Sequence, residues 1–341
     1  MKQAISRRHW VKAMGATGAL GGLGLLGACG GGSEATLVVQ ESLAASLLST
    51  TPANQAATYR HADRLYPTRA IRRGTSVLPL PAHSVNLSAL RYESNGVMSS
   101  IEDYMNRNRT AGLLILKGGA VALERYGMGN DASSLWTSFS AAKSVTSTLI
   151  GAALRDGSIR SLDDGVTRYL PQLRGSAYEL NSVRDLLRMT SGVGWIEEYS
   201  TTGNSDIARL LAAMTSGQSG AILELMRTRP RVAAPGSVFN YSTGKSYVLG
   251  AIVAAATGSS LSDYLSQKVW APMGMEADGY WLLVTGCSIP QMGRKWVVTT
   301  SVRRCVTTPA LACFSSGRAW LTAVVCCLAG GEIRPGSRIR R

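Results

Sequence analysis

Ser140 and Lys143 are the residues whose types and spacing most directly suggest chemistry. They lie in the stretch WTSFSAAKSVTSTLIGAAL, residues 136–154, separated by two alanines. On a helix, positions i and i+3 share a face, so the hydroxyl and the amine can meet. One interpretation is a surface serine and lysine on an amphipathic helix. The other is a nucleophile with its base.

A serine nucleophile needs a base, because its hydroxyl is protonated at neutral pH. The chain has three histidines, His9, His61 and His83, and all precede this stretch. We expect a structural role for His83, which lies in an extended segment, so a Ser-His-Asp triad is not favoured. A lysine can take the proton if burial among apolar neighbours lowers its pKa. The residues expected to supply this apolar lining are Ala141, Ala142, Val145 and Leu149. The positive end of the helix dipole near Ser140 would favour negative charge on a substrate.

Turn signals on either side of Ser140 indicate the elements that must position it. The segment GLLILKGGAVALERYG, residues 112–127, has two β-type runs around Gly118-Gly119, which predicts a hairpin. The helix that follows is expected to run from Ser140 to about Arg155. It should end at Asp156-Gly157, because glycine suits the left-handed residue after a helix.

The chain beyond this helix is mostly helical in pattern. Ser182 is a candidate N-cap of a short helix in NSVRDLLRMTSGVGW. Residues 206–229 and 242–270 are further helical stretches, and the segment 235–244 between them has the composition of a loop. The order of elements is therefore a hairpin followed by a helical block, with no internal repeat.

Length and composition indicate one substantial globular core, with 341 residues of which 45% are hydrophobic and 17% charged. The net charge of +15 is concentrated at the two ends. Residues 1–28 carry four basic and no acidic residues, and residues 284–341 carry nine basic residues against one acidic. The 23 basic and 20 acidic residues between them nearly cancel. Basicity therefore gives no support for a nucleic-acid partner.

The first 28 residues have the pattern of a targeting segment. Arg7-Arg8 precede a Gly/Ala/Leu run that ends in Leu-Gly-Ala-Cys at Cys29. This order resembles a bacterial twin-arginine export signal followed by a lipobox. It implies cleavage, lipidation at Cys29 and an exported, periplasmic or cell-envelope protein, held on the membrane by lipid alone. Residues 29–55 are expected to form a linker.

Residues 284–341 differ in composition from the rest of the chain. They contain five of the six cysteines and show no helical or alternating period. The cysteine spacings match no metal site. We expect this tail to be disordered, and our hypothesis is that it is the product of a shifted reading frame. Translation of the gene in the other forward frames would test this.

Three blocks resemble the serine β-lactamase and penicillin-binding-protein superfamily. They are residues 136–173, VRDLLRMTSGVGW and PGSVFNYSTGKSYVLG, and they occur in the family's order. The resemblance covers residues 56–283 and is closest to class C-like esterases and 6-aminohexanoate-oligomer hydrolases. It implies an α/β (α+β) fold of the β-lactamase/transpeptidase type: an antiparallel sheet with flanking helices and a helical subdomain.

The resemblance also implies roles for individual residues. Ser140 would be the acylated nucleophile, Lys143 its base, and Tyr241 the tyrosine that shuttles a proton to the leaving group. Tyr199 resembles a substrate-side tyrosine, with a structural role equally open. Thr243 stands where β-lactamases have asparagine, which favours a small amide or ester as substrate. The mechanism needs no metal or cofactor, and oligomeric state is not indicated.

One family motif is missing from the sequence. A Lys-Thr-Gly or His-x-Gly segment is expected beyond residue 283, on a strand that supplies an oxyanion donor, and neither occurs there. We therefore expect the C-terminal strands of the fold to be missing. Two interpretations stay open: a serine hydrolase, or an inactive truncated pseudoenzyme or cell-wall-binding lipoprotein of the same family.

Overall fold

The structure of the chain is a computed structural model that describes residues 43–83, 86–199, 205–283, 300–302 and 324–328, the last two segments as backbone only. These residues lie within one compact unit. Its strands are β1 (Thr68–Ile71), β2 (Tyr92–Ser94), β3 (Val97–Ser99), β4 (Thr110–Lys117), β5 (Ala120–Tyr126), β6 (Gly279–Leu282), β7 (Thr300–Val302) and β8 (Val324–Leu328).

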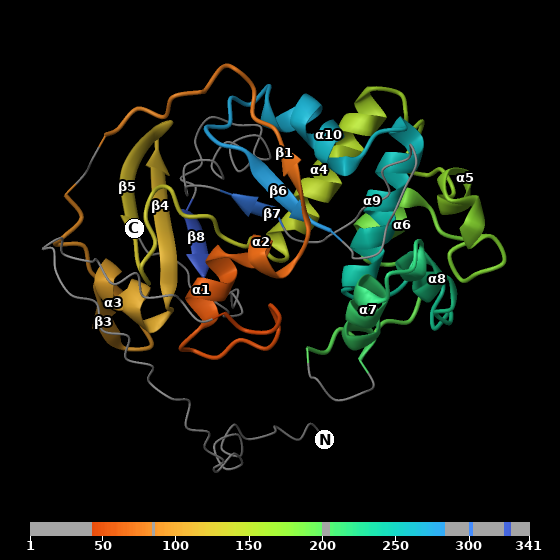
Figure 1. Cartoon of the computed structure of the whole chain (residues 1–341), viewed down its shortest axis with the longest axis horizontal. Coiled ribbons are helices and arrows are strands. Elements are labelled where there is room, and N and C mark those ends of the chain that lie inside the picture. Colours follow the sequence, from red (N-terminus) through yellow and green to blue (C-terminus); the bar gives the residue numbers. More distant parts are fainter. Residues whose placement is uncertain (1–42, 84–85, 200–204, 284–299, 303–323, 329–341) are drawn as a thin grey trace, which may run out of the picture. The chain divides into compact units, whose positions relative to one another are not determined.

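The strands pair in the antiparallel direction throughout the described segments. One sheet has the order β5-β4-β8, a second has the order β1-β6-β7, and β2 pairs with β3 alone. The expected hairpin is confirmed as β4 and β5, joined through Gly118 and Gly119, both of which have positive φ. Figure 1 shows the pair β4–β5 on one side and most of the helices on the other.

The helices fill the remaining stretches much as the periodicity predicts. They are α1 (Gln55–Arg60), α2 (Ala62–Leu65), α3 (Ile101–Arg107), α4 (Ala141–Arg155), α5 (Val166–Tyr169), α6 (Val183–Leu187), α7 (Asp206–Thr215), α8 (Ala221–Arg227), α9 (Thr243–Thr257) and α10 (Leu261–Leu265), with a 3-10 turn η2 (Pro171–Leu173) and a π-helical turn η3 (Ser266–Trp270). The predicted N-cap is confirmed, because the Ser182 hydroxyl accepts the Asp185 N–H at 3.1 Å.

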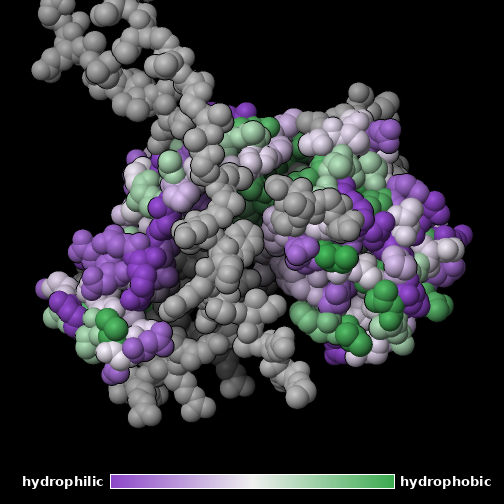
Figure 2. Space-filling view, turned by 90° about the horizontal axis from the view of Figure 1, so that it is seen from below, coloured by the Kyte–Doolittle hydropathy of each residue, from purple (hydrophilic) through white to green (hydrophobic). Residues whose placement is uncertain are grey.

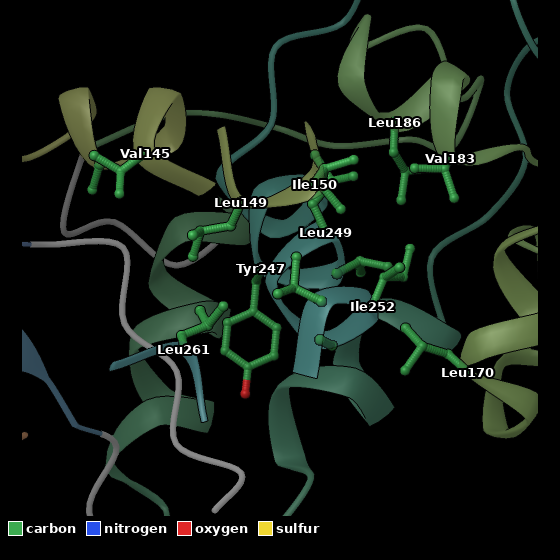
Figure 3. Close-up of a cluster of buried hydrophobic side chains, with 14 of the residues drawn as sticks. Val145, Leu149, Ile150, Leu170, Val183, Leu186, Tyr247, Leu249, Ile252 and Leu261 are labelled. Atoms are coloured by element: carbon green, nitrogen blue, oxygen red, sulfur yellow. The ribbon is translucent and has the colours of Figure 1, made fainter. Parts of the chain in front are cut away.

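Helix α9 is the centre of the main core. It is buried from Thr243 to Val253 and packs against α4, α6 and α8. Figure 3 shows Tyr247, Leu249 and Ile252 from α9 meeting Leu149 and Ile150 from α4. A helix surrounded on all sides carries apolar residues around its whole circumference, which is why its sequence lacks a polar face.

The segment expected to be a linker is packed from residue 43 onward. Ala44 and Leu47 are buried, and the Ala44 N–H donates to the Thr58 hydroxyl at 2.9 Å. Leu47 joins an apolar cluster with Tyr59 and Leu282. Residues 43–55 therefore belong to the folded unit rather than to a linker, and the part of the predicted linker before residue 43 lies outside the described residues.

Two strands come from the tail in which no periodicity was found. β7 pairs with β6, and β8 pairs with β4, with Val324 opposite Ile115 and Leu328 opposite Thr110. The expectation of a wholly disordered tail is wrong for these two strands. The rest of the tail lies outside the described residues, so the loss of the family's C-terminal strands stays a prediction.

The described surface is mixed in polarity. On the face shown in Figure 2, hydrophobic residues are scattered in small groups among hydrophilic ones. No single helix among the described residues is long and apolar enough to cross a membrane. Only Thr243–Thr257 and Leu261–Trp270 together reach that length, and they are bent by 80° where they meet.

Candidate active site

The chain enters α4 through a strained residue. Phe139 has φ of 45°, in the left-handed region that non-glycine residues seldom adopt, and Ser140 follows as the N-cap of α4. The Phe139 ring packs edge-on against Tyr59, with ring centroids 4.7 Å apart. Such strain persists only where the surroundings hold it, and it concentrates at functional sites. Phe139 thus fixes the direction in which the Ser140 side chain leaves the backbone.

Ser140 and Lys143 meet as their spacing predicts. The Lys143 Nζ lies 3.0 Å from the Ser140 Oγ, to which it donates a hydrogen bond. The Ser140 hydroxyl does not cap its own helix, so it is not held by the α4 backbone. The pair therefore has the geometry that a nucleophile and its base require.

The apolar neighbours expected from α4 itself do not surround Lys143. Ser140 is exposed and Lys143 only half-buried, whereas Val145 and Leu149 point into the main core. The reason is helical geometry: at about 100° per residue, Val145 lies about 200° around the helix from Lys143. The prediction that these side chains line the amine is therefore wrong.

Tyr241 lies next to Lys143. It is in the loop before α9, and the Lys143 Nζ is 5.1 Å from the centre of its ring. This distance is typical of a cation–π contact. Tyr241 is 38% exposed, so a substrate can reach it. The structure therefore brings Ser140 and Lys143, at the start of α4, together with Tyr241, in the loop before α9, about a hundred residues further along the chain.

A pocket of about 110 Å³ opens beside this group. Its polar lining residues are Ser140, Lys143, Tyr199 and Thr243, together with the hydroxyl-bearing Tyr66. The other lining residues are apolar: Leu47, Leu48, Phe139, Ile207, Leu210, Leu211, Met214 and Leu282. Tyr199 thus lies in the same pocket as the serine and the lysine.

Glu197 is a residue that the sequence analysis missed. Its carboxylate accepts hydrogen bonds from the Tyr199 hydroxyl at 2.7 Å, from the Thr243 N–H at 2.8 Å, and from the Thr243 hydroxyl and the Trp195 indole N–H. Partial burial and the hydrogen bond from the Tyr199 hydroxyl to the Glu197 carboxylate raise the pKa of Tyr199. Tyr199 therefore stays protonated and directs its proton to Glu197. A carboxylate two residues before the tyrosine was the only available signal.

Lys245 was missed as well. It lies in the first turn of α9, is completely buried, and donates to the Asn240 backbone oxygen at 2.8 Å and to the Asn240 Oδ1 at 3.0 Å. Burial lowers the pKa of Lys245 to about 8, while the Glu197 carboxylate acts in the opposite direction. The sequence signal that could have identified it is a lysine within an otherwise apolar helix.

The remaining candidates contribute little to this site. His83 is exposed, and its backbone N–H donates to the Val121 oxygen at 2.9 Å, in keeping with a structural role. Cys29 and the segment expected to hold the third motif lie outside the described residues. Within the described segments, no group of three or more His, Cys, Asp or Glu side chains could hold a metal ion.

Comparison with known proteins identifies the family. The model of the beta-lactamase family matches residues 97–309, which is more than half of the chain, and the protein belongs to this family. The 6-aminohexanoate-dimer hydrolase of Paenarthrobacter ureafaciens is 28% identical over 218 residues, which are 63% of this chain and 54% of that protein. Esterase EstB of Burkholderia gladioli is 34% identical over 130 residues, 35% of this chain and 32% of that protein.

A solved structure supports the fold. The "Putative 6-aminohexanoate-dimer hydrolase from Bacillus anthracis" superposes with a TM-score of 0.67 and 20% identity, covering 80% of this chain and 70% of that one. The β-lactamase/transpeptidase-like fold expected from the sequence is thereby confirmed. The match to the P. ureafaciens hydrolase covers only about half of that protein's length.

Proposed function

We propose that this protein is a serine hydrolase that forms an acyl-enzyme on small amide or ester substrates. The observation that carries the proposal is the 3.0 Å contact between the Lys143 Nζ and the Ser140 Oγ at the edge of a pocket. Membership of the beta-lactamase family supports it. The proposed roles are nucleophile for Ser140, base for Lys143 and proton donor for Tyr241.

The first half of the reaction is acylation. Lys143 takes the proton of the Ser140 hydroxyl, and the Oγ attacks the substrate carbonyl carbon. The carbonyl oxygen becomes an oxyanion near the N-terminus of α4, where the helix dipole favours negative charge. The bond to the leaving group then breaks, and the leaving amine or alkoxide receives a proton from Tyr241, which the proton on Lys143 replaces.

The second half is hydrolysis of the ester formed on Ser140. A water molecule loses a proton to Lys143 and attacks the acyl carbon. The Ser140 oxygen leaves and regains that proton, and the acid product departs. Atoms and charges balance without any further reactant.

The pocket and the relatives support the proposed substrate class. Thr243 stands where β-lactamases have asparagine. Its N–H and its hydroxyl both donate hydrogen bonds to the Glu197 carboxylate, so neither group is available to bind a substrate. The lining is mainly apolar. Two relatives are named 6-aminohexanoate-dimer hydrolase and Esterase EstB. These observations favour an open-chain amide or ester over a β-lactam.

The N-terminal sequence supports a proposal about location. Arg7-Arg8 and the sequence before Cys29 have the order of an export signal with a lipidation site. We propose that the protein is exported to the bacterial cell envelope and anchored there by lipid on Cys29.

A fluorophosphonate probe tests the proposed function, because it reacts with an activated serine. Folded wild-type protein should be labelled at Ser140, and Ser140→Ala should abolish the label. Lys143→Met should slow labelling by about 100-fold or more, since a positioned general base contributes that much. Ser144→Ala is the matched control, because Ser144 is an exposed serine on the same helix. Folded wild-type protein that takes no label would refute the proposal and favour an inactive relative.

A further inference from the structure

We propose that Lys245 is a positioning residue for Tyr241, acting through Asn240. The inference rests on the proposed function, in which Tyr241 donates a proton to the leaving group. Lys245 touches neither the pocket nor the reacting atoms. Its contacts instead fix the backbone on both sides of Tyr241.

The first contact is made by the side chain of Lys245. The Nζ reaches back from the first turn of α9 and donates to both oxygens of Asn240, at 2.8 Å to the backbone oxygen and 3.0 Å to the Oδ1. Lys245 is completely buried, so these bonds are not exchanged with water. A buried donor is retained only where it is paired, and here both partners belong to the residue just before Tyr241.

The second contact is made by the backbone of Lys245. Its N–H donates to the Ser242 Oγ at 3.1 Å, which makes Ser242 the N-cap of α9. Ser242 is completely buried and follows Tyr241 directly. Lys245 therefore holds the residue before Tyr241 through its amine and the residue after it through its amide.

Asn240 is a firm point of attachment because its other groups are also engaged. Its N–H donates to the Met189 oxygen at 2.8 Å, and its side-chain amide donates to the Trp195 oxygen at 3.3 Å. Met189 has φ of 57°, so the chain there is held in the left-handed region. With Lys245 satisfying both oxygens, Asn240 ties α9 to the segment that leads to Tyr199.

A lysine suits this task better than an apolar residue of equal size. A methionine would fill the same space but leave the half-buried Asn240 oxygens without the Lys245 donor. The amine can serve both acceptors whether charged or neutral, since even the neutral form has two N–H bonds. Burial lowers the pKa of Lys245 to about 8, and the Glu197 carboxylate favours the charged form. The hydrogen bonds from the Lys245 Nζ to Asn240 are therefore kept both below and above pH 8.

Tyr241 itself needs such support, because its side chain is 38% exposed and meets Lys143 through its ring face. The position of its hydroxyl therefore depends on the backbone at residues 240–242. A displacement of about 1 Å at a catalytic group costs up to about 100-fold in rate. Loss of the Lys245 amine should impair the step that uses Tyr241 and spare the steps that do not.

The test compares two substrates with the same acyl group. p-Nitroacetanilide releases an amine that must be protonated, whereas p-nitrophenyl acetate releases a phenolate that leaves without a proton. We expect Lys245→Met to lower kcat for the anilide by about 10- to 100-fold, with KM and the rate of fluorophosphonate labelling changed by less than about threefold. Turnover of the ester should fall much less than turnover of the anilide. Lys268→Met is the control: Lys268 pairs with Asp156 away from the pocket, and its loss should leave both activities unchanged.

Double variants show whether the effect passes through the named residues. Lys245→Met should cost little more in a Tyr241→Phe or an Asn240→Ala background than those changes cost alone. Asn240→Ala tests the same link if Lys245→Met does not fold. Additive losses, or equal losses on both substrates, would overturn the inference while leaving the proposed function intact. Absence of label on the wild-type protein would overturn both.

Discussion

Removing the Glu197 carboxylate should destabilise the protein by an amount that the structure defines. In Glu197→Ala, the Thr243 N–H and the Trp195 indole N–H both lose their acceptor, and these residues are only 7% and 6% exposed. A buried donor without a partner costs about 1–3 kcal/mol, so two cost about 2–6 kcal/mol. Tyr199 is 54% exposed, so water can replace its lost partner. The expected loss is a large share of the roughly 5–15 kcal/mol that holds a typical domain together.

Urea unfolding followed by tryptophan fluorescence measures this loss. The midpoint should fall at an unchanged m-value, since the variant exposes about the same additional surface on unfolding as the wild type does. Glu197→Gln keeps one acceptor oxygen and should lie between the wild type and Glu197→Ala. Glu198→Ala is the control, because Glu198 is the exposed neighbour and its loss should change stability by less than about 0.5 kcal/mol. A Glu197→Ala protein as stable as the control would refute the assignment of Glu197 as the acceptor that joins these segments.

Three further predictions concern pH, backbone and anchoring. The pKa of Lys245 is about 8 in the folded protein, below the ordinary value of 10.5. The buried charge therefore lowers the free energy of unfolding by its full amount below pH 8, and it has no effect above pH 10.5. Between pH 8 and 10.5, the free energy of unfolding of the wild type, measured by urea titration, should rise relative to that of Lys245→Met by up to about 1.4 kcal/mol per pH unit. Gly192→Ala places a Cβ 2.0 Å from the Ala233 oxygen at φ of 68°, and thermal unfolding should show a loss of about 3 kcal/mol or more. Gly175→Ala, with φ of 71° and open space, should cost only about 1–2 kcal/mol. Cys29→Ser should abolish palmitate incorporation and release the protein from the membrane fraction.

Each of these has a contrary outcome. A pH-independent difference between wild type and Lys245→Met would show that the amine is not buried in the folded protein. Equal losses from the two glycine changes would show that contact with Ala233 is unimportant. Continued lipid labelling of Cys29→Ser would show that the lipid is attached at another residue.

Local sequence was enough to predict the hairpin and the helix that carries Ser140. Gly118 and Gly119 predicted the turn, and Gly157 the end of α4, because each position has the positive φ that glycine tolerates. The contact between Ser140 and Lys143 was also predictable, since residues three apart on a helix face the same way. The approach of Tyr241 to Lys143 was expected only from the family resemblance.

Several features could not be predicted because they depend on distant segments. Leu47 was assigned to a linker because its own neighbours are small and polar, and only its packing against Leu282 shows that it is part of the core. Strands β7 and β8 have no period of their own, and their pairing is determined by the open edges of β6 and β4. In both cases the partner lies more than a dozen residues away.

The sequence by itself determined the family and the contact between Ser140 and Lys143, because these depend on short motifs whose geometry is helical and local. The tertiary structure alone decided what surrounds them. It turned the apolar residues near Lys143 into the core and left the amine half-exposed. It also placed the Glu197 carboxylate on Thr243, 46 residues away in the chain, and buried Lys245. The physical reason is that burial and long-range hydrogen bonds depend on which surfaces meet when the chain closes, and no short stretch of sequence contains both partners.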